Sequence, residues 1–325
     1  MKTLREPAEL ASEGRPVALA IGVFDGVHLG HQEVIRRTVA AARRANGPAV
    51  VATFDRHPNA VVAPDRMPLA ILPTSLRLQA FAELGVDAAW LIRFDEAFSR
   101  QTGEEFVRRL VTGFGRVAHI CVGRDFHFGW RRSGDVDLLR RLGAELGFTS
   151  EAVPPQTLAG HIISSTGIRE LIRRGALAEA ARWLGRPYRF AGPVIRGDGL
   201  GRQLGFPTAN LDVTGLQLPP GGVYAAWVQG PDDWCPAVMN LGTRPTVTAA
   251  AGELRVELHL LGRDCDLYGQ ELVVQPVCRL RAEQRFASLE DLKAQIARDI
   301  AASRAVLVEV TPPSARGVVG RPGRT

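Results

Sequence analysis

The stretch IGVFDGVHLGHQEVI, residues 21–35, decides how the first half of the chain is organised. The apolar run VALAIGV at 17–23 is typical of a buried strand, and the residues from His28 onward are typical of an amphipathic helix. A helix that starts directly after a strand offers free backbone N–H groups and the positive end of its dipole. Because His28 and His31 lie at that start, the stretch predicts an anion-binding site.

Gly30 separates the two histidines, and its missing side chain lets a ligand approach the backbone closely. Two imidazole donors beside a helix start suit negative charge that develops on a phosphorus centre. Two other interpretations remain open from the residues alone. The histidines could be polar residues of a surface loop, or two ligands of a zinc site whose other ligands come from elsewhere.

Strand-like and helix-like runs alternate around this stretch. The predicted strands are 17–23, 49–54, 87–94 and 117–123, and the predicted helices are 28–46, 75–84, 104–111 and 136–146. This alternation favours a doubly wound α/β domain with a parallel sheet. Ligands of such sheets bind at the carboxyl ends of the strands. The polar residues directly after predicted strands are Asp25, His28, Asp55, His57 and Asp125.

The sequence pattern changes after a helical region at 165–185. Glycines and prolines then punctuate short β-rich runs at 189–195, 222–228, 236–242, 254–261 and 271–277, which predict a small antiparallel β-barrel. A helix should follow at 288–307, with Ser288 as its N-cap and an apolar stripe of Leu289, Leu292, Ile296 and Ile300. We therefore expect domains at 1–185 and 186–307, and a disordered tail at 308–325.

Composition limits the classes of function. The 325 residues are 46% hydrophobic and carry a formal net charge of +6, which suits ligands with phosphate groups. The sequence has no dense basic run with interleaved aromatic residues, so it does not predict nucleic-acid binding. The four cysteines (Cys121, Cys235, Cys265 and Cys278) are far apart, and no segment resembles a signal peptide or a membrane span. We expect a cytoplasmic protein of unknown oligomeric state.

Two more segments suit a nucleotide and a planar ligand. ISSTGIRELI, 163–172, places Ser165, Thr166 and Arg169 at a second helix start, where they could bind an anion or serve the helix cap. In VGRDFHFG, 122–129, two phenylalanines alternate with polar residues after a strand, and could stack on a planar ring or pack locally.

Four motifs in this order, GVFDGVHLGH, TFDRHP, VGRDFHFG and ISSTGIR, resemble the nucleotidyltransferase half of the bacterial bifunctional riboflavin kinase/FAD synthetase family. The resemblance implies transfer of an adenylyl group from ATP to FMN. It implies that His28 and His31 stabilise the transition state at the α-phosphate. It further implies that ATP is bound by Gly26, Ser165, Thr166 and Arg169. The residues near the flavin would be Asp125, Phe126 and Phe128.

The second half contains a candidate functional segment of its own, RGDGLGRQLGFPTANL at 196–211. It lacks the lysine of a Walker-type loop. Thr208 and Asn210 offer neutral oxygens that suit magnesium beside phosphates, although a plain turn between barrel strands is the alternative. In LRVELHLL, strict alternation places Glu257 on the face opposite Val256 and Leu258, which is ordinarily the solvent face.

The segments GFPTAN, GVYA, NLGTRPTV, VELHLL and DLYG and the final helix resemble the riboflavin kinase module of the same family. The resemblance implies that Thr208 and Asn210 bind Mg²⁺ and ATP, and that Glu257 is the catalytic base. The chemistry is coherent, because the hydroxyl of riboflavin must lose a proton whereas the phosphate of FMN is already an anion. The implied ligands are riboflavin, FMN, FAD, ATP and Mg²⁺.

The chain departs from the usual family pattern at Pro73, Val247, Gly262, Arg263 and Arg285. These departures bear on flavin affinity and loop closure rather than on the catalytic set. Two alternatives therefore remain: an adenylyltransferase whose second half only binds flavin, and a flavin-sensing or RNA-binding regulator without catalysis.

Overall fold

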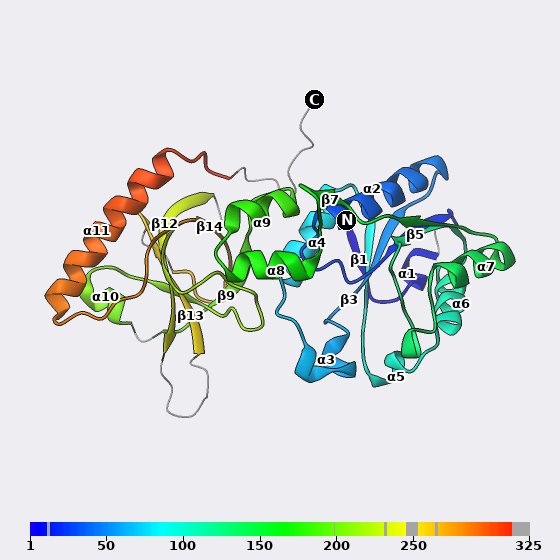
Figure 1. The fold of residues 1–325 in the computed structure, drawn as a ribbon, viewed down its shortest axis with the longest axis horizontal. Coiled ribbons are helices and arrows are strands. Elements are labelled where there is room, and N and C mark those ends of the chain that lie inside the picture. The colour runs from blue at the N-terminus through cyan, green and yellow to red at the C-terminus, as the bar shows by residue number, and fades with distance from the viewer. Residues whose placement is uncertain (12–13, 198, 231–232, 245–252, 264–265, 314–325) are drawn as a thin grey trace.

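A parallel sheet occupies the first half of the chain, and a closed barrel occupies the second (Figure 1). The computed structural model describes residues 1–325 except 12–13, 198, 231–232, 245–252, 264–265 and 314–325. The sheet domain lies on the right of Figure 1 and the barrel on the left. Two short helices, α8 (Ser165–Arg173) and α9 (Leu177–Leu184), lie between them.

The sheet has the strand order β1-β4-β3-β2-β5-β6, and all its neighbouring strands are parallel. Its strands are β1 (Lys2–Leu4), β2 (Val17–Ile21), β3 (Ala49–Phe54), β4 (Ala88–Ile92), β5 (Val117–Gly123) and β6 (Thr149–Val153). Every residue of β2 and β3 is buried. Continuous apolar strands are expected where helices cover both faces of a sheet.

Helices cover the two faces of the sheet. They are α1 (Ala8–Ala11), α2 (Leu29–Arg44), α3 (Asn59–Val62), α4 (Thr74–Glu83), α5 (Glu96–Ser99), α6 (Gly103–Phe114) and α7 (Val136–Leu146). The 3₁₀ turns Pro64–Arg66 and Trp130–Arg132 and the hairpin of β7 (Thr157–Leu158) and β8 (His161–Ile162) complete this half. Helices α6 and α7 pack on one face, while α2, α4 and α8 belong to the core of the other.

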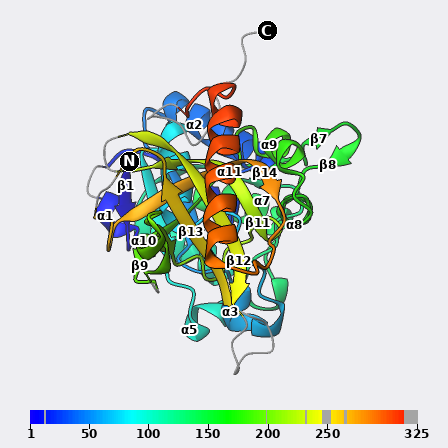
Figure 2. The ribbon, with the colours of Figure 1, turned by 90° about the vertical axis from the view of Figure 1, so that its left-hand side faces the viewer.

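The barrel closes in the order β10-β13-β12-β11-β14-β9 with antiparallel neighbours. Its strands are β9 (Phe190–Ile195), β10 (Ala209–Leu211), β11 (Gly222–Gln229), β12 (Trp234–Arg244), β13 (Glu253–Leu260) and β14 (Glu271–Arg281). The short helix α10 (Leu200–Leu204) precedes β10. The long helix α11 (Leu289–Val308) runs across the outside of the barrel (Figure 2).

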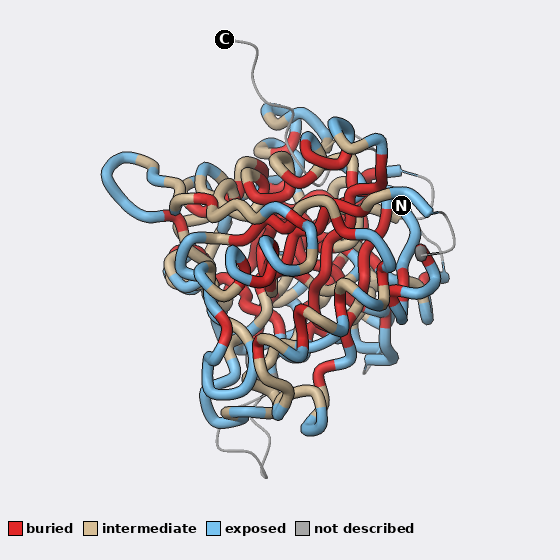
Figure 3. The backbone as a smooth tube through the Cα atoms, turned by 90° about the vertical axis from the view of Figure 1, so that its right-hand side faces the viewer, coloured by how far each residue is buried: buried red, intermediate tan, exposed pale blue. Residues whose placement is uncertain are grey.

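One hydrophobic cluster joins the two halves. It runs from Ile35 and Phe81 beside the sheet to Phe190 and Leu258 inside the barrel. Buried backbone accordingly runs through the middle of the molecule in Figure 3, with exposed loops around it. Ala70 adds backbone hydrogen bonds across the junction, because its N–H donates to Gly215 O and its carbonyl accepts from Gln217 N, both at 2.8 Å.

The structure confirms the predicted fold class, a doubly wound sheet domain followed by a small antiparallel barrel and a C-terminal helix. Sequence analysis missed several short elements, among them β1, β6 and β10. Ser288 caps α11 as predicted, since its Oγ accepts from Asp291 N at 3.1 Å. Leu289, the first residue of the predicted apolar stripe, is 59% exposed.

The alternation of β13 is confirmed at Val256, Leu258 and Leu260, which are all buried. Leu254 departs from it and is exposed, and Leu261 is buried against Val223 and Val238 on the α11 side. Cys121 and Cys278 are free thiols. Cys265, Val247 and the tail from 314 lie outside the described residues. Among the residues that the structure does describe, no helix combines the length and apolar character of a membrane span.

Candidate active sites

The two histidines of the opening stretch form a stacked pair at the start of α2. His28 is the N-cap, and its Nδ1 accepts a hydrogen bond from His31 N at 3.3 Å. The two ring centroids lie 3.5 Å apart with an interplanar angle of 19°. A Cβ at Gly30 would lie 3.2 Å from two atoms of the His28 ring. Gly30 therefore leaves room for the ring of His28 as well as for a ligand.

Burial keeps both histidines neutral. His28 is 6% exposed, and burial, aided by the charge of Arg186, lowers its pKa to about 3. Burial also holds the pKa of His31 well below its usual value. Because His28 Nδ1 accepts a hydrogen bond, the proton of its neutral ring is on Nε2. The pair therefore offers neutral N–H donors rather than cations.

Arg186 supports the turn that precedes the histidines, and sequence analysis missed it. Its guanidinium is buried and donates to the carbonyls of Gly26 at 2.6 Å, Val27 at 2.9 Å and Leu184 at 3.0 Å. Burial lowers its pKa to about 9. The sequence carries no signal for this contact, because Arg186 follows the turn by 159 residues or more.

Asp25 connects the start of α8, which contains Ser165 and Arg169, to the turn before α2. Its carboxylate accepts from Ile71 N at 3.0 Å and pairs with Arg169 Nη2 at 2.6 Å. Its carbonyl accepts from Ser165 Oγ at 2.9 Å. Arg169 Nε also donates to Leu69 O at 2.7 Å, so one face of this guanidinium is held by the protein. Among the partners of Asp25, only Ser165 and Arg169 lie in a motif that sequence analysis singled out.

These groups line one pocket of about 430 Å³ at the carboxyl edge of the sheet. Of the predicted residues, it is lined by Asp25, His28, His31, His57, Asp125, Phe126, Ser165, Thr166 and Arg169. Gly26 and Phe128 are not part of the lining. Phe128 stacks on Phe126 at 5.3 Å and contacts Phe106 at 5.8 Å, so it supports the aromatic wall from behind.

Asp55 follows a strand but does not join this pocket. Its carboxylate accepts from Phe94 N at 3.1 Å and so connects the loops after β3 and β4. His57, two residues further, does line the pocket. Of the polar residues that follow predicted strands, Asp55 is therefore the one outside the lining of this pocket.

A second pocket, of about 370 Å³, lies between the barrel and α11. Thr208, Asn210 and Glu257 all line it. The register of the strands explains their proximity, because Asn210 on β10 and Asn240 on β12 both pair with Glu257 on β13. Sequence analysis missed Asn240. Only the strand pairing, which is not visible in a single sequence, places it beside Glu257.

The pocket also has an apolar wall, which adjoins these polar groups because Val223 pairs with Asn240. It contains Phe206, Val223, Val238, Phe286, Leu292 and Ile296. The stripe of α11 thus lines a pocket at Leu292 and Ile296 instead of joining the core. At the same end, Arg281 makes a two-pronged ion pair with Asp299, with contacts of 2.7 to 3.1 Å, and Gln295 Nε2 donates to Asp299 at 2.8 Å.

Glycines bring the loop before β10 close to the polar groups. A Cβ at Gly197 would lie 2.2 Å from Asn210 Nδ2, and one at Gly201 would lie 3.0 Å from Thr208 Oγ1. Neither position has room for a side chain. The glycine-rich segment therefore approaches Thr208 and Asn210 as closely as its composition suggested.

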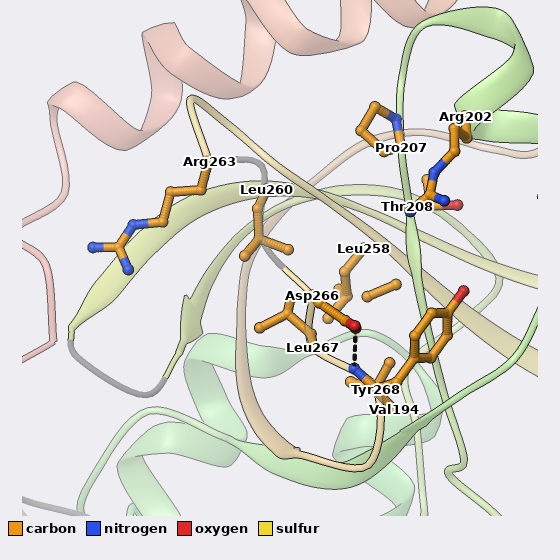
Figure 4. Close-up of a pocket in the computed structure, with 11 residues that line it drawn as sticks. Val194, Arg202, Pro207, Thr208, Leu258, Leu260, Arg263, Asp266, Leu267 and Tyr268 are labelled. Atoms are coloured by element: carbon orange, nitrogen blue, oxygen red, sulfur yellow. Dashed lines mark hydrogen bonds between the residues drawn. The ribbon is translucent and has the colours of Figure 1, made fainter.

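Thr208 also borders a smaller depression (Figure 4). Arg202, Arg263, Asp266 and Tyr268 surround it, and Asp266 Oδ1 accepts from Tyr268 N at 3.1 Å. Leu258 and Leu260 form its base. Thr208 therefore lines both the pocket with the apolar wall and a hollow with polar and aromatic walls.

Comparison with known proteins agrees with this division into two sites. The FAD synthetase family model matches residues 10–167, and the riboflavin kinase family model matches residues 184–307. The bifunctional riboflavin kinase/FMN adenylyltransferase of Escherichia coli K12 is 41% identical over 282 residues, which cover 86% of this chain and 90% of that protein.

The enzyme of the same name from Pseudomonas fluorescens is 41% identical over 307 residues, which cover 94% of this chain and 98% of that protein. A crystal structure of a Streptococcus pneumoniae protein, described as a macrolide-efflux protein, superposes with a TM-score of 0.77 and 29% identity over 93% of this chain and 98% of that one. The efflux description belongs to that protein, whereas both family models and the relatives of higher identity carry enzyme names. The chain therefore belongs to the family of bifunctional riboflavin kinase/FMN adenylyltransferases.

Proposed function

We propose that the chain makes FAD in two ATP-dependent steps at its two pockets. The barrel pocket transfers the γ-phosphoryl group of ATP to riboflavin, which yields FMN, ADP and a proton. The histidine pocket transfers the adenylyl group of a second ATP to FMN, which yields FAD and pyrophosphate. The observation that carries the proposal is the gathering of each predicted residue set around its own pocket.

In the barrel pocket, the apolar wall suits the flavin rings and the glycine-rich loop suits phosphates. The depression beyond Thr208 would accept the nucleoside of ATP, with Tyr268 beside it. Glu257 would take the proton of the ribityl hydroxyl as that oxygen attacks. Asn210 and Asn240, its two strand neighbours, would orient the reacting groups.

The oxygens of Thr208 and Asn210, with the carboxylate of Glu257 nearby, form a hard donor set that fits Mg²⁺. Thr208 and Asn210 would hold the ion. When bound, Mg²⁺ neutralises part of the phosphate charge. The protein residues position the two substrates and receive the proton.

In the histidine pocket, the neutral His28 and His31 would donate hydrogen bonds to the oxygens of the α-phosphate. The start of α8, with Ser165, Thr166 and the free edge of Arg169, would bind the other phosphates. Asp125 and Phe126 would lie beside the flavin. Gly26 would act through its backbone, since its carbonyl is held by Arg186.

We further propose domain limits of 1–185 for the adenylyltransferase and 186–307 for the kinase. The enzyme would work on small molecules alone, in the cytoplasm. The free thiols of Cys121 and Cys278 fit a reducing compartment.

A time course with riboflavin, ATP and Mg²⁺, followed by chromatographic separation of the flavins, tests the proposal. We expect FMN to appear first and FAD to follow. If riboflavin stays unchanged while added FMN still becomes FAD, the barrel is a flavin-binding module only. Flavin binding with no ATP turnover would instead identify a regulator.

A further inference from the structure

Three potential metal ligands lie on the sheet, away from the residues that line both proposed active sites. They are His119 and Cys121 on β5 and Glu151 on β6, and one ligand atom of each lies within 4.8 Å of the others. The strands explain the cluster. His119 and Cys121 are two residues apart and so share a face, and Cys121 pairs directly with Glu151.

The hydrogen bonds of His119 fix which of its nitrogens carries the proton. Its Nδ1 lies 2.8 Å from Thr149 Oγ1, and Thr149 uses its one hydroxyl proton to donate to Ala118 O at 3.1 Å. With that proton on Ala118 O, Nδ1 is placed to donate to Thr149 Oγ1 in the neutral ring. Nε2 is left with a lone pair.

Nε2 is buried and has no hydrogen-bond partner among the residues that the structure describes. It faces Glu151 Oε2 at 3.6 Å, which is too long for a hydrogen bond. The other carboxylate oxygen, Oε1, is already paired with Arg37 of α2. Two lone pairs that face each other with no proton between them repel, whereas a cation placed between them would bind both.

Cys121 completes a donor set of nitrogen, sulfur and oxygen. Its side chain is fully buried, in the core cluster that also contains Val34 and Ile35 of α2. Imidazole, thiolate and carboxylate are the ligands of zinc, and a site with three protein ligands keeps a fourth position for water. The side chains of His119 and Glu151 are 14% and 35% exposed, so an ion can reach the cluster from solvent.

We propose that His119 Nε2, Cys121 Sγ and Glu151 Oε2 form a Zn²⁺ site on the α2 side of β5 and β6. Binding replaces the thiol proton by the metal and releases that proton to solvent. The bound ion would join β5 to β6 beneath α2, the helix whose start holds His28 and His31. Its expected effect is to stabilise the fold, with no part in either reaction.

The experiment uses the untagged full chain, stripped with a chelator and then titrated with Zn²⁺ in competition with a zinc indicator. We expect one equivalent to bind and the Tm to rise with Zn²⁺. Cys121→Ser, His119→Gln and Glu151→Gln should each weaken binding by about tenfold or more. Two matched controls, Cys278→Ser and His161→Gln, replace exposed residues of the same types and should bind like the wild type.

Co²⁺ supplies a second readout, because a cobalt–thiolate bond gives a charge-transfer absorption band. That band should appear in the wild type and in His28→Gln/His31→Gln, and it should be absent in Cys121→Ser. No stoichiometric Zn²⁺ binding would overturn the proposal. So would binding that survives Cys121→Ser and is lost in the His28/His31 variant, since the metal would then occupy the histidine pair. If Cys121→Ser fails to fold, Glu151→Gln and His119→Gln decide by the same titration.

Discussion

At the scale of single residues, the neighbours of Glu257 single it out as the candidate catalytic base. Asparagines flank it on both adjacent strands, and it lines the pocket with the apolar wall. We expect Glu257→Gln to lower riboflavin phosphorylation by about 10²- to 10⁴-fold, because the amide cannot accept the hydroxyl proton. FAD formation from supplied FMN should stay unchanged, as should both activities of the exposed control Glu290→Gln. Equal loss of both activities in Glu257→Gln would contradict the division into two sites.

Loss of the histidine pair should affect the two reactions in the opposite way to Glu257→Gln. Removing two donors that face developing charge costs about 10²- to 10³-fold for each donor in comparable sites. We therefore expect His28→Ala/His31→Ala to lose FMN adenylylation and to keep riboflavin phosphorylation. Chromatography of the flavins measures both rates in one sample. Normal FAD formation by this variant would remove the histidines from the mechanism.

The neutral state of His28 also predicts how stability depends on pH. Its folded-state pKa of about 3 lies below the ordinary value of 6.5, so below pH 6.5 the unfolded chain binds a proton that the folded chain does not. Stability should therefore fall as the pH drops from 6.5 toward 3, by about 1.4 kcal/mol per pH unit from this group.

His28→Gln tests this, because glutamine does not titrate. Between about pH 7.5 and pH 5, the free energy of unfolding should fall by about 2 kcal/mol less in the variant than in the wild type. Urea denaturation at the two pH values measures the difference. The exposed control His161→Gln should follow the wild type. Parallel curves for His28→Gln and the wild type would show that His28 is not held neutral.

At the scale of elements, α11 contributes to a site as well as to the core. Asp299, Ser303 and Leu307 are its buried residues, whereas Leu292 and Ile296 line the flavin-sized pocket. We expect Leu292→Ala and Ile296→Ala each to raise the KM for riboflavin by roughly fivefold, since each loses half-buried apolar contacts. Leu289→Ala, on the same helix but 59% exposed, is the matched control. Unchanged KM values in both pocket variants would place the flavin elsewhere.

The same helix shows what sequence periodicity can and cannot predict. The spacing of Leu292, Ile296 and Ile300 correctly identified one apolar face and a cap at Ser288. It could not tell whether that face would meet protein or a ligand, because both are apolar surroundings. The short strands were missed by sequence analysis for another reason. The strand β1 has three residues and β10 has three, too few for any period to appear.

At the scale of the whole molecule, contacts between distant parts of the chain escaped prediction. Motifs named Asp25, Arg169 and Ser165 separately, but only the fold shows that Asp25 contacts the other two. The loop at 69–72 joins them, since it donates to Asp25 and also hydrogen-bonds the 215–217 segment at the barrel. Backbone partners of this kind leave no trace in side-chain chemistry, so a single sequence cannot reveal them.

Arg186 tests the importance of such contacts for the adenylyl site. It stands at the predicted domain limit, yet its guanidinium holds the carbonyls of Gly26 and Val27 in the turn before the histidines. Arg186→Ala would remove the donor to the Gly26 carbonyl, whereas Gln32 Nε2 would still donate to the carbonyls of Val27 and Leu184. We therefore expect the free energy of unfolding to fall by about 1–3 kcal/mol. FMN adenylylation should fall by about tenfold or more while riboflavin phosphorylation stays near normal, because the barrel pocket does not contact this turn.

Two variants sharpen this prediction. Arg186→Lys keeps a positive charge but lacks the fork that reaches several carbonyls, so its rate of FAD formation should lie between those of the wild type and Arg186→Ala. Arg182→Ala removes an exposed arginine of α9 and should change neither rate. Both rates are measured below the Tm of the least stable variant, where all the proteins are folded. If riboflavin phosphorylation falls as far as adenylylation in Arg186→Ala, Arg186 stabilises the molecule as a whole and does not position the histidine turn.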